Sequence, residues 1–178
     1  MSGPVQHAGV MHWLAAAVIF WASGSAAGAA AGPLVLVDNG KAAATIVTAA
    51  QPGENARIAA AELQHYIGKI SGATLPIATE DAAPPDGAMI LVGRSRLTDR
   101  IAGLEIPTGK PKPLLEEGLV LWADGNRLVL AGNDIQPYYG TRYAVAEFLH
   151  TLGVRWFMPG EFGEVVPKLK TIAVRPPG

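Results

Sequence analysis

The chain has 178 residues, of which 49% are apolar and 16% are charged, and its net charge is −1. This composition gives one globular domain enough apolar material for a core without disulfides or bound metal. Basic residues form no stripe or block, which argues against nucleic acid as the main partner. The absence of cysteine excludes disulfide frameworks, thiol catalysis and cysteine-based zinc sites.

Residues 13–22 are wholly apolar, and a stretch of small residues follows them. Such a run is too short for a membrane span, which needs about 20 residues, but it matches the apolar core of a signal peptide. We therefore expect residues 1–31 to be a signal peptide cleaved near residues 29–31. The mature chain, residues 32–178, is then exported to the periplasm or the extracellular space without a stable membrane span. Because no Lys or Arg precedes Lys41, an uncleaved membrane anchor or an incorrectly assigned start codon is the alternative.

The first half of the mature chain predicts three strands and a helix. Apolar and β-branched runs at residues 34–37 and 45–48 are typical of strands. The continuous apolar run at residues 89–92 predicts a strand buried on both faces. Between them we expect a helix with Asn55 as its N-cap and Gly72 directly after its end. Its apolar residues recur at steps of three and four: Ala56, Ala59, Ala60, Leu63, Ile67 and Ile70.

The second half predicts a hairpin, a second helix and a short strand. Two apolar strands, residues 118–122 and 127–130, flank an Asp-Gly-Asn turn that accepts the positive φ values of tight hairpins. The apolar stripe of residues 141–152 predicts the helix, and residues 155–158 predict the strand. Two helices among about seven strands, without regular alternation, predict an α+β fold. In it, a mixed β-sheet packs against two main helices that form a layer.

Few residues of the mature chain are suited to catalysis. His65 and His150 fall on predicted helices, and no zinc-binding pattern surrounds them. Ser71 and Ser95 lack the glycine pattern of a nucleophile elbow. We therefore expect no cofactor, no metal site and no complete active site in this chain.

The candidates for contact with a carbohydrate are acidic and aromatic residues near two turns. Glu161 and Glu164 could form a carboxylate pair, which glycoside hydrolysis requires at ~5 to 9.5 Å. Trp156 beside them could stack on a sugar ring. The alternative, which the pattern favours, is an acidic turn next to a buried tryptophan. Tyr138 and Tyr139 could form an aromatic platform for a sugar or could anchor the start of the following helix.

Four segments, in this order, resemble an accessory domain of glycoside hydrolases. They are residues 60–77, 90–93, 117–145 and 152–167. Their helix, strand, hairpin and second helix look like the N-terminal domain of bacterial α-glucuronidases and of family-twenty β-N-acetylhexosaminidases. The last segment most resembles uncharacterised secreted bacterial proteins related to these enzymes. The resemblance covers about residues 34–174 and implies a structural domain that packs on a following (β/α)₈ barrel. The catalytic carboxylates of these relatives lie in the barrel, so none is assigned to this chain.

The sequence supports three hypotheses about the function of the chain. The leading hypothesis is a non-catalytic N-terminal domain of a secreted glycoside-hydrolase-like protein, a scaffold for a barrel in the same or a neighbouring chain. This hypothesis expects an exposed apolar patch where the barrel docks. The alternative is a free-standing carbohydrate-binding module, which needs at least two exposed rings on one face among Trp122, Trp156, Tyr138 and Tyr139. The least favoured is a complete small hydrolase that uses Glu161 and Glu164.

Overall fold

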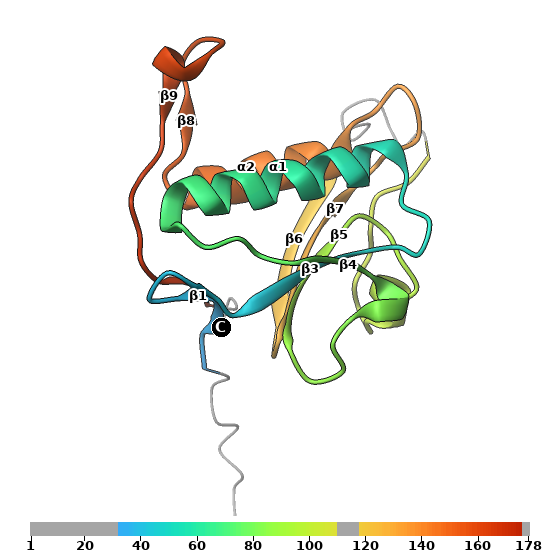
Figure 1. The fold of residues 1–178 in the computed structure, drawn as a ribbon. Helices are drawn as coiled ribbons and strands as arrows, with labels where there is room; N and C mark the ends of the chain where they lie inside the picture. The colour runs from blue at the N-terminus through green and yellow to red at the C-terminus, as the bar shows by residue number, and fades with distance from the viewer. Residues whose placement is uncertain (1–31, 110–117, 176–178) are drawn as a thin grey trace, which may run out of the picture.

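The computed structural model describes residues 32–109 and 118–175, so the expected signal peptide lies outside the described residues. The fold is α+β, as predicted: two helices form a layer on one face of a mixed five-stranded sheet (Figure 1). The helices are α1 (Glu54–Ser71) and α2 (Gly140–Thr151). The sheet contains β3 (Ala44–Thr48), β4 (Ile77–Thr79), β5 (Ala88–Val92), β6 (Leu119–Asp124) and β7 (Arg127–Gly132).

The strand order of this sheet is β4-β3-β5-β7-β6. Strands β4, β3, β5 and β7 are parallel, and β6 pairs antiparallel with β7. Both helices follow parallel strands, so both begin at the edge of the sheet where those strands end. That edge therefore collects the loops after β3, β5 and β7, the place where open sheets of this kind commonly bind ligands.

A second, smaller sheet has the order β10-β1-β2. It joins β1 (Leu34–Asp38) to β10 (Ile172–Val174) and to β2 (Lys41–Ala42), both antiparallel. The first and last strands of the described chain thus lie side by side, a pairing that local sequence patterns do not encode.

The core lies mainly between the helices and the large sheet. The largest fully buried side chains there include Leu36, Ile46, Leu63, Ile67, Leu130 and Leu149. The opposite face of the sheet carries a smaller cluster around Val47, Leu91 and Val129, against which Leu97, Leu104 and Trp122 pack. Strand β5 is therefore buried on both faces, as its continuous apolar run predicts.

Helix α1 ends where predicted but begins two residues earlier. Gly72 has a φ of 80° and donates its N–H to the carbonyl of Gly68 over 2.8 Å, a left-handed C-terminal cap. The predicted N-cap Asn55 is wrong, because Gly53 occupies that position and Asn55 lies in the first turn. The Asn55 amide instead donates to the carbonyl of Tyr138 over 3.1 Å, which ties the start of α1 to the loop before α2.

Helix α2 approaches the end of β7 so closely that two glycines are required. A Cβ on Gly132 would lie 2.5 Å from the carbonyl carbon of Gly140, and a Cβ on Gly140 would overlap the backbone nitrogen of Asn133. The backbones are joined there, because Gly140 donates its N–H to the carbonyl of Asn133 over 2.8 Å. The helix therefore begins at Gly140, one residue before the predicted start.

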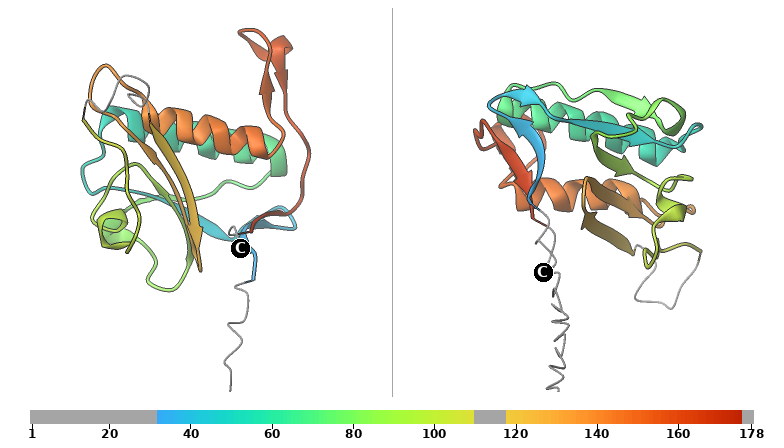
Figure 2. Two further views of the ribbon diagram at one scale, coloured as in Figure 1. Left: turned by 180° about the vertical axis from the view of Figure 1, so that it is seen from behind. Right: turned by 90° about the horizontal axis from the view of Figure 1, so that it is seen from below.

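The predicted hairpin between β6 and β7 is present, and Gly125 at its turn has a φ of 55°. The predicted strand at residues 155–158 is shorter than expected. Only β8 (Arg155–Trp156) forms, paired antiparallel with β9 (Glu164–Val165). Beyond Trp156 the chain turns through Gly160, at a φ of 92°, and a short 3₁₀ turn at Glu161–Gly163. Residues 155–165, hereafter the arm, project beyond the helix layer (Figure 1 and the left view of Figure 2).

Candidate functional site

The base of the arm is tied to α1 by a chain of hydrogen bonds. The indole N–H of Trp156 donates to the hydroxyl oxygen of Tyr66 over 2.6 Å. The Tyr66 hydroxyl donates in turn to Glu164 Oε1 over 2.8 Å. The ammonium group of Lys69 donates to Glu164 Oε2 over 2.5 Å. Both carboxylate oxygens of Glu164 are therefore engaged by the helix.

The electrostatics of this cluster favour the ionised form of the Glu164 carboxylate. The hydrogen bond from Lys69, helped by the one from Tyr66, lowers the pKa of Glu164. The hydrogen bond to Glu164 raises the pKa of Lys69. Burial raises the pKa of Tyr66, so its hydroxyl stays protonated and remains a donor. A general acid needs the opposite shift, so Glu164 is best explained as the anchor of the arm.

The other residues predicted near this turn lie in different settings. The ring of Trp156 is half-buried and meets the Tyr66 ring edge to face, with centroids 5.2 Å apart. Glu161 lies in the exposed 3₁₀ turn at the tip of the arm. The structure therefore does not present Glu161 and Glu164 as two free carboxylates on one cavity. Tyr66 and Lys69, which the sequence analysis missed, stand three residues apart on α1, a spacing that places both on one side of the helix.

The tip of the arm exposes large apolar side chains. Phe157 is 74% exposed, Met158 is 60% exposed and Phe162 is fully exposed. The backbone around them is fixed, because the Phe157 N–H donates to the carbonyl of Gly163 over 2.8 Å and Gly163 has no room for a Cβ beside Met158. The arm thus holds an apolar tip at a defined position away from the core.

The predicted aromatic platform at Tyr138 and Tyr139 is only half present. Tyr138 is 7% exposed, so only a small part of it is open to contact with a sugar, and its role as a carbohydrate contact stays a prediction. Tyr139 is 45% exposed and lies on a cleft of about 520 Å³ at the start of both helices. The cleft lining comprises Gly53, Glu54, Asn55, Ile58, Asp134, Gln136, Pro137, Tyr138, Tyr139 and Arg142.

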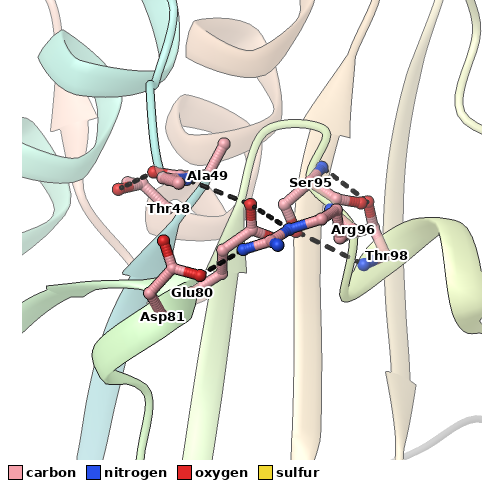
Figure 3. A network of polar contacts seen from close by, with 8 residues as sticks. Thr48, Ala49, Glu80, Asp81, Ser95, Arg96 and Thr98 are labelled. Carbon is pink, nitrogen blue, oxygen red and sulfur yellow. Dashed lines mark hydrogen bonds and ion pairs between the residues drawn. The ribbon is translucent and has the colours of Figure 1, made fainter.

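A polar network at the same edge of the sheet joins the loops that follow three parallel strands (Figure 3). Glu80, directly after β4, accepts hydrogen bonds from the N–H of Ala50 over 3.1 Å and from the N–H of Arg96 over 2.8 Å. The Arg96 guanidinium bonds both Glu80 and Asp81. Burial alone would raise the pKa of Glu80, but the hydrogen bonds from Ala50 and Arg96 lower it overall. The network explains how the edge is held together, and no sequence pattern signals it.

Among residues 32–109 and 118–175, no three His, Asp or Glu side chains are grouped so that they could hold a metal ion. Within the same residues, neither helix has the length and apolar character needed to cross a membrane. The chain matches none of the protein-family models, and no curated protein matches it.

Proposed function

We propose that this chain is a non-catalytic N-terminal domain of a secreted glycoside-hydrolase-like protein, and that it supports a (β/α)₈ catalytic barrel in the same or a neighbouring chain. The observation that carries the proposal is the apolar tip of the arm. Phe157, Met158 and Phe162 are exposed together within six residues, and isolated soluble domains rarely expose such groups without a partner. Aromatic side chains held at fixed positions are typical anchors of protein interfaces.

The charges of the arm favour a protein over other partners. From Trp156 to Pro167 the chain carries two glutamates and no Lys or Arg. Anionic membrane surfaces and nucleic acids both attract basic residues, and this segment has none. The resemblance to glycoside hydrolase accessory domains supplies the identity of the protein partner, a catalytic barrel.

The rigid base of the arm supports the same proposal. The hydrogen bonds among Trp156, Tyr66 and Glu164 fix the direction in which the arm leaves the domain. Binding through an arm that is already fixed costs less conformational entropy than binding through a loop that must first become ordered. The engagement of Glu164 also explains why the chain alone is not expected to hydrolyse glycosides.

The test begins with the coding DNA beyond the codon for Gly178 and in the neighbouring genes. We expect a barrel-coding stretch there, and the encoded barrel, co-produced with this chain, should be captured by it. A Phe157→Ser, Phe162→Ser double variant should lose capture, and the control Leu169→Ser, an exposed apolar residue away from the arm, should keep it. Absence of any barrel-coding stretch, or equal capture by the double variant, would contradict the proposal.

Export is part of the same proposal. The N-terminus of the protein recovered from the periplasm or culture medium should begin near residues 29–32, which N-terminal sequencing would measure. Recovery of the intact Met1 terminus in the cytosol would argue against a secreted protein.

A further inference from the structure

The cleft at the start of both helices continues into a second hollow along α2. The second hollow has a volume of about 280 Å³ and is lined by Glu62, Tyr139, Arg142, Tyr143 and Ala146. Tyr139 and Arg142 line both spaces. The two hollows therefore adjoin at these two side chains, and together they make one surface at the start of α2.

Two tyrosine rings stand on this surface. Tyr139 is 45% exposed and Tyr143 is 44% exposed. They are four residues apart, Tyr143 donates its N–H to the carbonyl of Tyr139 over 3.1 Å, and both residues line the second hollow. The Arg142 guanidinium lies over the Tyr139 ring, 5.6 Å from its centre, a cation–π contact. The sequence analysis considered Tyr138, but the structure offers Tyr143 as the second ring.

Polar side chains line both hollows beside the rings. Glu54 and Asp134 line the first hollow with the amide of Gln136, and Glu62 lines the second. Asp134 uses one carboxylate oxygen to accept the N–H of Thr141 over 3.0 Å, which holds it in place at the start of α2. Carboxylates and amides accept hydrogen bonds from hydroxyl groups, and Gln136 and Arg142 also donate.

We propose that this surface, the aromatic strip of Tyr139 and Tyr143 with the polar groups around it, binds a short neutral oligosaccharide. A pyranose ring has an apolar C–H face that can stack on a tyrosine ring and a rim of hydroxyl groups that carboxylates and amides can bind. Binding sites of this kind combine aromatic surface with a few placed polar groups. The three carboxylates outnumber the single guanidinium, so an anionic sugar or a nucleic acid strand is disfavoured.

The inference does not depend on the proposed barrel. The arm and the aromatic strip are separate surfaces, since the arm comprises residues 155–165 and the strip lies on α2 and on the loop before it. A chain with a barrel could use the strip to hold substrate near the catalytic domain, and a chain without one could use it to bind a polysaccharide.

Titration of the full chain tests the inference. Isothermal calorimetry and tyrosine fluorescence would be followed with neutral hexasaccharides of β-linked glucose, xylose, mannose and N-acetylglucosamine, and with an oligogalacturonate as the anionic probe. We expect saturable binding of at least one neutral sugar and none of the oligogalacturonate. The inference would be overturned if no neutral sugar produced heat of binding or a change in fluorescence. It would also be overturned if only the oligogalacturonate bound.

Variants then locate the binding. Tyr139→Ala and Tyr143→Ala should each weaken affinity by about three- to tenfold, the worth of one aromatic contact. Tyr139→Phe and Tyr143→Phe should bind like the parent, because stacking needs the ring and not the hydroxyl. Phe157→Ala, an exposed ring on the arm, is the matched control and should leave sugar affinity unchanged. Unchanged sugar affinity in both alanine variants would overturn the assignment of the binding site to Tyr139 and Tyr143. The assignment would also be overturned if the chain bound no sugar and Tyr143→Ala abolished capture of the barrel.

Discussion

The indole N–H of Trp156 lies 2.6 Å from the hydroxyl oxygen of Tyr66, and the two rings meet edge to face. These residues are 90 positions apart in the chain. The Tyr66 hydroxyl also donates to Glu164, which accepts a second hydrogen bond from Lys69, so α1 holds both strands at the base of the arm.

Tyr66→Phe should destabilise the protein by about 1–3 kcal/mol. The variant keeps the ring but removes the acceptor of the Trp156 N–H and a donor to Glu164, and buried polar groups without partners are costly. The free energy of unfolding in urea measures the effect. Tyr143→Phe, which removes an exposed hydroxyl, is the control and should change stability by less than about 0.5 kcal/mol. Equal effects of the two variants would contradict the role of Tyr66.

The contribution of Glu164 to stability should depend on pH. Its pKa in the folded state is lowered by Lys69 and Tyr66, so its stabilisation is fully present above the ordinary value of 4.5 and is lost as pH falls through the lower folded pKa. Glu164→Gln should therefore be less stable than the parent at pH 7, and the difference should shrink below pH 4.5. Urea unfolding across this pH range measures it.

The matched control for the pH experiment is Glu105→Gln, in an exposed loop. Its stability should follow that of the parent at every pH. If Glu164→Gln and the parent differed by a constant amount from pH 3 to 7, the carboxylate would not be the group responsible.

Two glycine substitutions should act in opposite directions. Gly140→Ala should cost about 3 kcal/mol or more, because its Cβ would overlap the backbone at the end of β7. Gly68→Ala lies inside α1, where a Cβ would meet only the carbonyl of Ala73 at 3.8 Å. It should stabilise the protein by about 0.5–1 kcal/mol through helix propensity. Thermal unfolding compares them, and a tolerated Gly140→Ala would refute the close approach of α2 to β7.

Phe162→Ala and Phe148→Ala should differ in their effect on the free energy of unfolding, because Phe162 lies on the proposed partner surface and Phe148 lies in the core. Phe162 is fully exposed on the arm, so its removal should change the free energy of unfolding by less than about 0.5 kcal/mol and should reduce self-association at high concentration. Phe148 lies on the buried face of α2, and its removal should cost about 3–5 kcal/mol. Urea unfolding and light scattering measure the two effects. A large loss of stability in Phe162→Ala would show that the arm packs on the domain.

Local patterns in the sequence determined the helices, most of the strands and the stop at Gly72. Apolar periodicity and turn chemistry act over a few residues, so the sequence alone predicts the apolar stripe of α1 and the turn at Gly125. The start of α1 lies two residues before the predicted one, because Gly53 and Asn55 are both acceptable caps and only the contact of Asn55 with Tyr138 separates them.

The tertiary structure alone decided the roles of the candidate residues. Glu164 is an anchor because its partners on α1 lie 95 and 98 positions away, and no local spacing could place them beside it. Tyr138 and Tyr139 are neighbours in the chain, yet one is buried and the other exposed. The packing of α2 against α1 and β7 sets that difference. Sequence periodicity specifies which face of an element is apolar, whereas the contacts between elements specify what each polar side chain can do.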